Sequence, residues 1–189
     1  MIISLKDFPI LSTKVEWGRI TTQFTLEAVE DEALISNISI VPVIGDRYVM
    51  MKLDTGVWEL AGGTLKRDEP YLDALRREVQ EELGAELIAY HVLGHFRCSS
   101  RAEQPYLPHI PHPDFIRLVG YGEVRLIGEP LNPPDGEKVI LVDVVGIEEA
   151  IRRFEEINRR DLSELYRLVH LTRTSEKQNV SDTINGIKL

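Results

Sequence analysis

The sequence predicts an α/β fold, because strand-like segments come first, one amphipathic helix follows, and further strands lead into two closing helices. At 189 residues the chain has the length of one domain and can bury a substantial core. Its hydrophobic content of 43% and charged content of 28% are those of a soluble globular protein.

Strands are expected where short runs of β-branched, aromatic and apolar residues lie between turn residues. In chain order these runs cover residues 15–17, 20–26, 35–44, 47–53, 58–60, 86–97, 115–127 and 138–145. Gly45 and Asp46 stand between the third and fourth runs and predict a tight hairpin turn. The fifth run is expected to lead into a glycine loop at Gly62 and Gly63.

The clearest helix is expected at residues 70–83. Apolar side chains that recur at helical spacing define a face to be buried: Leu72, Leu75, Val79 and Leu83. Pro70 suits the first helical position, and Gly84 can adopt the left-handed conformation that ends a helix. Two further helices are expected, one at residues 147–157 and one after a cap at Asp161.

Three carboxylates of the first helix share one narrow arc beside its apolar face: Glu78, Glu81 and Glu82. Like charges this close raise one another's pKa and disfavour ionisation unless a cation lies among them. Hard oxygen ligands suit magnesium or manganese. We therefore expect the helix to bind a divalent cation, and the ordinary alternative is a solvated acidic face.

The acids belong to a longer pattern that a solvated face does not explain. Its positions are Gly63, Glu69, Arg77, Glu78, Val79, Glu81, Glu82 and Gly84. This segment resembles the signature box of the Nudix hydrolases, in which a glycine, a glutamate, an Arg-Glu pair, a Glu-Glu pair and a closing glycine recur at these offsets. Ala85 departs from the box, where a larger aliphatic residue is usual.

The resemblance implies an α/β/α sandwich with a mixed sheet, and a pyrophosphohydrolase that acts on phosphoanhydrides. Such an enzyme hydrolyses a nucleoside diphosphate linked to another moiety, for example ADP-ribose or a nucleotide sugar, and releases a nucleoside monophosphate. The resemblance also implies a site for Mg²⁺ or Mn²⁺. Its ligands would be Glu78, Glu81, Glu82 and the backbone carbonyl of Gly62 or Gly63.

In the same resemblance Arg77 and Glu69 pair across the loop and orient the acids. The catalytic set is then Glu69, Arg77, Glu78 and Glu81. The general base is either Glu78 or Glu81, or an acid on a later loop or strand. The later candidates are Glu103, Asp114 and Glu123.

A proline-rich connection at residues 99–114 is long for a compact domain, and such loops are often functional. Its Tyr106, His109 and His112 could stack on a substrate or bond to it, and Glu123 on the next strand is the fourth candidate for substrate contact. The alternative is a surface loop that its prolines stiffen.

The composition of the chain excludes some kinds of binding partner. A net charge of −9 argues against a duplex nucleic-acid partner, and no apolar run approaches a membrane span. With no export signal and a single cysteine, Cys98, we expect a cytoplasmic protein without an internal disulfide. We expect Cys98 to be a buried or half-buried thiol without a catalytic role, and a small nucleotide derivative to be the partner.

Three other functions stay open: a nucleoside triphosphate pyrophosphohydrolase, a nucleotide sensor without activity, and an isoprenoid diphosphate isomerase that would need Cys98. Residues 1–34 are expected to form strands that extend the substrate pocket or the edge of a homodimer. Residues 35–173 would be the Nudix domain with its closing helices. Residues 174–189 are polar, lack an apolar stripe and are expected to be a flexible tail.

Overall fold

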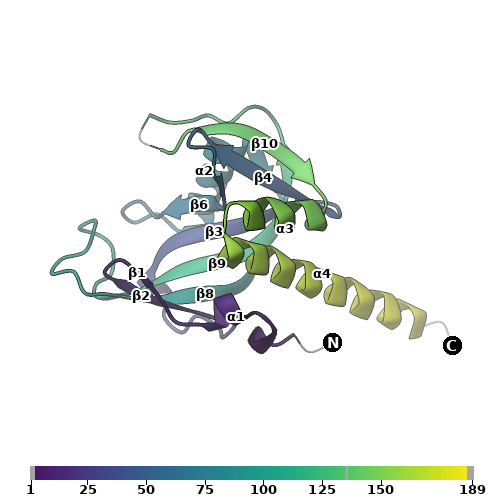
Figure 1. Cartoon of the computed structure of the whole chain (residues 1–189), viewed down its shortest axis with the longest axis horizontal. Coiled ribbons are helices and arrows are strands. Elements are labelled where there is room, and N and C mark those ends of the chain that lie inside the picture. The colour runs from purple at the N-terminus through teal and green to yellow at the C-terminus, as the bar shows by residue number, and fades with distance from the viewer. Residues whose placement is uncertain (1–2, 135, 187–189) are drawn as a thin grey trace.

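A mixed β-sheet forms the middle layer of the computed structural model, which describes residues 3–134 and 136–186 (Figure 1). The helix Tyr71–Leu83 (α2) packs on one face of the sheet. The helices Ile147–Glu156 (α3) and Arg160–Gly186 (α4) pack on the other face. The predicted α/β/α sandwich is therefore confirmed.

The strands agree with the sequence patterns in number and order, apart from two differences described below. They are Val15–Trp17 (β1), Ile20–Thr25 (β2), Ile35–Ile44 (β3), Arg47–Leu53 (β4), Trp58–Glu59 (β5), Ala61–Thr64 (β6), Ala85–Leu87 (β7), His91–Ser100 (β8), Asp114–Leu126 (β9) and Val139–Val145 (β10). The short helical elements are Leu5–Asp7 (η1), Pro9–Ser12 (α1) and Glu32–Leu34 (η2).

The sheet runs in the order β1-β2-β8-β9-β3-β4-β10. The pairing of β3 with β9 is parallel, and the other strand pairs of the described residues are antiparallel. One edge of β3 is shared, because its first half pairs with β6 and its last residues form the expected hairpin with β4.

Two apolar cores lie on the two faces of the sheet, and the alternation along β3 explains both. Val41 and Val43 pack toward α3 and α4, whereas Ile38 and Ile40 pack toward α2. The next strand, β4, divides its side chains between the same two cores. These strands therefore read as continuous apolar runs because both of their faces are buried.

Helix α2 differs from its prediction in small ways. Pro70 is the N-cap, with extended backbone, and the helix starts at Tyr71. Gly84 ends it in the left-handed conformation, at φ 58°, as expected. Leu72 is only half-buried, and Ala74 takes its place on the buried face.

The expected glycine loop is a strand instead. In β6, Gly62 pairs with Ser39 and Gly63 pairs with Ile38 of β3. A Cβ on Gly62, whose φ is 142°, would lie 2.2 Å from the backbone oxygen of Ile38. Only glycine allows this close approach, so the two glycines are part of the sheet and hold a fixed register.

The expected strand at residues 86–97 is two strands. Ile88 and Ala89 both donate their backbone N–H to the carbonyl of Glu123, so the chain bulges between β7 and β8. The apolar run across this point contains no glycine or proline that would have indicated the break.

Helix α4 continues to Gly186, well past residue 173, where we expected helical structure to end. Tyr121 donates to the carboxylate of Glu176, and Lys177 pairs with Asp46, so side chains beyond residue 173 are anchored to the sheet and hairpin. Residues 187–189 of the predicted tail lie outside the described residues. No helix in the described part of the chain combines the length and the apolar character needed to cross a bilayer.

Candidate active site beside the glycine strand

Arg77 is the centre of the acidic cluster on α2. Its Nε and Nη2 each donate to one oxygen of Glu69, both at 2.9 Å. Its Nη1 donates to Glu78 at 2.6 Å and to Glu81 at 3.3 Å, and Nη2 also reaches the carbonyl of Thr64 at 3.3 Å. The predicted pair of Arg77 and Glu69 is therefore confirmed, and it fixes the position of two box acids.

Electrostatics agree with this geometry. The Arg77 guanidinium lowers the pKa of Glu69 below its usual value, although partial burial opposes the shift. Burial raises the pKa of Glu78, although Arg77 acts in the opposite direction. The effect of Arg77 therefore outweighs that of burial at Glu69, whereas burial outweighs Arg77 at Glu78.

Glu82 bonds to the glycine strand rather than to Arg77. Its Oε2 accepts the backbone N–H of Gly62 at 2.8 Å. Burial raises the pKa of Glu82 to about 8, the charges of Glu78, Glu137 and Glu59 act in the same direction, and the Gly62 bond opposes them. This carboxylate therefore resists ionisation when no cation is near it.

Glu78 lies directly against the backbone of the same strand. A Cβ on Gly63 would stand 2.1 Å from Oε1 of Glu78 and 2.5 Å from its carboxyl carbon. A side chain at position 63 would therefore displace the Glu78 carboxylate from its present place against β6.

The chemistry of these acids fits a divalent cation. Glu78, Glu81 and Glu82 offer the hard oxygen donors that such ions take, and the protein leaves the charge of Glu78 and Glu82 incompletely compensated. As they stand, side chains of the described residues do not enclose an ion, because two of the acids bond to Arg77 and the third bonds to Gly62.

A polar cavity of about 440 Å³ opens beside the glycine strand. Gly62 and Gly63 line one side, and the acids of α2 lie behind them, outside the cavity wall. The wall also brings together polar side chains that are far apart in the sequence, among them Asn37, Glu59, Arg117, Glu137, Arg159 and Asp161. The glycine strand is therefore the contact between the acids and the cavity.

Most charges of this cavity are paired. Arg159 binds both Glu59 and Asp161, and all three side chains are partly buried or near the cavity wall. The side chains of Arg117 and Glu137 form no hydrogen bond or ion pair with the described residues; Arg117 instead lies 5.2 Å from the ring centre of Trp17. Within residues 3–134 and 136–186, one cation and one acid of the cavity wall therefore have no ionic partner.

Two of the predicted substrate residues reach the rim of the box. The hydroxyl of Tyr106 donates to Asn37 at 3.2 Å and lies 3.3 Å from the hydroxyl of Thr64, next to Gly63. His109 bonds through Nε2 to the carbonyl of Leu65 at 2.8 Å. Neither side chain lines the cavity.

The other two predicted substrate residues lie elsewhere. His112 bonds to the carbonyl of Ala102 and so closes its own loop. Glu123 accepts the N–H of Gly45 at the hairpin and pairs with Val43, five residues along β3 from the partner of Gly63. Five strand positions span roughly 16 Å, so Glu123 is not part of this site.

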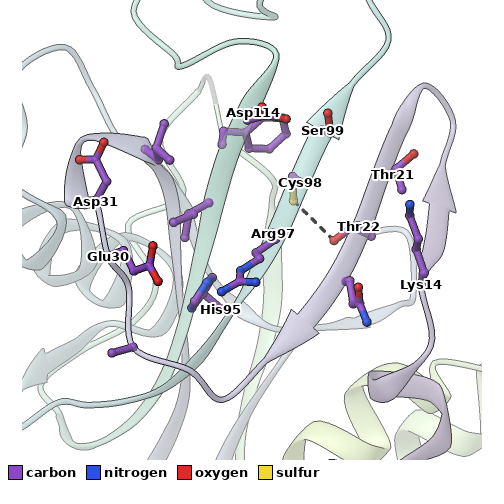
Figure 2. A pocket seen from close by; sticks show the side chains of 15 residues that line it. Lys14, Thr21, Thr22, Glu30, Asp31, His95, Arg97, Cys98, Ser99 and Asp114 are labelled. Atoms are coloured by element: carbon purple, nitrogen blue, oxygen red, sulfur yellow. Dashed lines mark hydrogen bonds between the residues drawn. The ribbon is translucent and has the colours of Figure 1, made fainter.

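The remaining acids that we considered as bases do not line the cavity either. Glu103 is exposed on the long loop. Asp114 lines a separate cavity of about 520 Å³ between β2, β8, β9 and the segment before β3 (Figure 2). No residue of the box lines that second cavity.

Cys98 is buried, as expected, in the region shown in Figure 2, and its Sγ donates to Thr22 Oγ1 at 3.5 Å. Burial raises the pKa of its thiol, which disfavours the thiolate. Because Cys98 does not line the box cavity, the structure does not support the isomerase alternative.

Sequence reasoning missed Glu137, Arg159 and Arg117. Arg159 lies in the short connection between α3 and α4, and its side chain turns into the cavity toward Glu59. Arg117 did carry a signal, because it interrupts the buried apolar run of β9 between Ile116 and Leu118.

Residues 36–168 match the family model of the NUDIX domain. The solved pyrophosphohydrolase BsRppH of Bacillus subtilis, a mutant form, aligns with a TM-score of 0.57 at 14% identity, over 82% of this chain and 92% of that one. An ADP compounds hydrolase aligns with a TM-score of 0.49 at 14% identity, over 88% of this chain and 92% of that one. A MutT NUDIX hydrolase from Burkholderia pseudomallei aligns with a TM-score of 0.42 at 21% identity, over 59% of this chain and 82% of that one. A comparison with curated protein sequences gives no significant match.

Proposed function

Because this chain belongs to the Nudix family of hydrolases, we propose that it cleaves the diphosphate linkage of a nucleoside diphosphate that carries a second group. The products would be a nucleoside monophosphate and the phosphorylated remainder. ADP-ribose and nucleotide sugars are substrates of this type.

One observation carries the proposal: the complete set of box acids adjoins, through two glycines, a cavity with an unpaired arginine beside an aromatic ring. The acids suit a metal-bound diphosphate, the arginine suits a phosphate, and the ring suits a nucleobase. A substrate with all three groups would use every part of the site.

Divalent ions are general cofactors in this family, and Mg²⁺ is the ion we expect here. Glu78, Glu81 and Glu82 would hold it. When bound, the ion neutralises phosphate oxygens and lowers the pKa of a bound water. Arg77 keeps Glu78 and Glu81 in position, and Gly62 keeps Glu82 against the strand.

Glu137 is our candidate for the general base. It lines the cavity, its charge raises the pKa of Glu82, and no other described side chain binds its carboxylate. Glu59 and Asp161 also line the cavity, but both are bound to Arg159 and are less available to accept a proton. Glu137 could therefore take a proton from an attacking water.

A substrate panel tests the proposal. We would incubate the protein with MgCl₂ and ADP-ribose, UDP-glucose, ATP or dGTP, and separate the products by anion-exchange chromatography. Nucleoside monophosphate from the first two compounds is the expected result. Pyrophosphate release from the triphosphates alone would favour the triphosphate pyrophosphohydrolase, and tight nucleotide binding without any turnover would favour a sensor.

A further inference from the structure

The polar cavity beside the glycine strand continues into a less polar one. This adjoining cavity measures about 410 Å³; its apolar wall comes from Ile10, Leu11, Val15, Phe24 and Phe96, and Thr13, Thr22, Asn158, Arg160 and Asp161 line the rest. Trp17 and Arg159 line both cavities, so the two are adjacent compartments of one depression. A ligand that fills both would have one charged part and one apolar or aromatic part.

Arg117 belongs to the polar compartment only. Across the sheet it pairs with Asn37 of β3, which in turn pairs with Thr64 of β6, next to Gly63. Two strand spacings separate it from the glycine strand, or about 10 Å. Its guanidinium therefore stands between the box and the aromatic compartment.

Trp17 stands where the two compartments meet. Its ring is 5.4 Å from that of Phe96, at an angle of 51°, and Arg117 lies over it. Trp17 is half-buried, so part of the indole remains accessible to a ligand. An aromatic ring in an apolar cavity stacks on nucleobases, and an unpaired guanidinium binds phosphate oxygens.

We propose that Trp17 and Arg117 bind the nucleoside monophosphate half of the substrate. The base lies against Trp17 in the apolar compartment, and the adjacent phosphate bonds to Arg117 in the polar one. This inference rests on the proposed function and adds to it the residues that select the nucleoside. The N-terminal segment is then a wall of the substrate pocket.

Fluorescence tests the base site without any need for turnover. The chain has two tryptophans, and Trp58 lines neither cavity, so a Trp58→Phe variant reports on Trp17 alone. We expect AMP to quench this fluorescence, whereas ribose 5-phosphate and inorganic phosphate at equal concentration leave it unchanged. In the matched Trp17→Phe variant, AMP should not affect Trp58.

Kinetics test the same residues on the proposed substrates. Trp17→Ala and Arg117→Gln should each raise KM for ADP-ribose or UDP-glucose by about 10- to 100-fold, with kcat changed much less. Trp17→Phe should restore most of the affinity, because it keeps an aromatic face. If Trp17→Ala does not fold, the Trp58→Phe titration still decides the question.

The fluorescence and kinetic results together distinguish a failure of the nucleotide site at Trp17 and Arg117 from a failure of the proposed hydrolysis. Turnover with no quenching by AMP, and with unchanged KM in both variants, would overturn the inference and leave the hydrolase intact. Quenching by AMP that requires Arg117, without turnover on any compound, would support the nucleotide site and overturn the proposed hydrolysis.

Discussion

Two arginines near the glycine strand have opposite surroundings. Arg77, behind the strand, bonds to Glu69, Glu78 and Glu81 and to a backbone carbonyl. Arg117, on the cavity side, lies over the ring of Trp17 and forms no hydrogen bond or ion pair with the described residues. A guanidinium whose donors are all used holds other side chains in place, whereas one at a cavity wall without an ionic partner can bind a ligand. Substitutions in the box should therefore change mainly kcat, and substitutions of Arg117 or Trp17 should change mainly KM.

The largest effect is expected at Glu137. Glu137→Gln removes the base and should lower kcat by about 100- to 10,000-fold, while KM and metal affinity change little. Steady-state kinetics over a range of Mg²⁺ concentrations would measure all three. Glu129→Gln, an exposed acid on the same connection, is the control. Equal losses in both variants would mean that Glu137 has no specific role.

Glu82→Gln should lower metal-dependent turnover by at least about 100-fold, because it removes a ligand but leaves the apolar face of α2 intact. Circular dichroism should show an unchanged fold. Glu86→Gln is the control, since Glu86 is exposed and pairs with Arg125 at the surface. A near wild-type rate for Glu82→Gln would show that the ligand assignment is wrong.

Arg77→Lys should lower kcat by about 10- to 100-fold with little change in KM, because lysine cannot reproduce the forked contacts to three carboxylates. Arg76→Lys, an exposed neighbour that bonds only to Asp73, should behave like the wild type. A rise in KM without a fall in kcat would show that Arg77, like Arg117, acts in substrate binding.

The metal-free protein should lose stability as the pH rises from about 4.5 to 8. Folding raises the pKa of Glu82 from 4.5 to about 8, so in this range the folded state binds a proton that the unfolded state has released. Urea unfolding in EDTA at several pH values would measure the slope. Glu82→Gln should flatten it, and the same slope in that variant would assign the effect to another group.

The smallest effect is expected at Arg101. This arginine also lies near the N-terminal strands, but it pairs with Glu16, the neighbour of Trp17, at the surface. Arg101→Ala should change the free energy of unfolding by less than about 1 kcal/mol and leave KM unaltered. Thermal unfolding and kinetics would measure both. A KM change as large as that of Arg117→Gln would point to a general loss of positive charge.

Much of the fold could be predicted because its signals are local. The apolar spacing of α2, the left-handed cap at Gly84 and the turn at Gly45 each depend on neighbours within a few residues. The strand β6 could not be predicted from its pattern, because Gly62 and Gly63 have no side chains to alternate. Its partner, β3, is more than twenty residues away.

The candidate site could be predicted only where it is continuous in sequence. The pair Arg77 and Glu69 follows from the box, and the geometry confirms it. Glu137 and Arg159 come to the cavity from separate connections, and no local pattern reports such convergence. Glu123 was chosen for its charge, and its place in the register near Gly45 could not be known. The homodimer and the cytoplasmic location stay predictions.

The strand β3 couples the geometry of the cavity to the integrity of the core. Asn37 and Ser39 face the cavity, and Ile38 and Ile40, which alternate with them, face α2. A slip of one position would bury the amide of Asn37 and the hydroxyl of Ser39 among apolar side chains and turn two isoleucines toward the cavity. The spacing between Gly62 and Gly63 on β6 and Arg117 on β9 is therefore fixed by the same register as the core. A change of substrate preference must then come from exchanging side chains on an unchanged backbone.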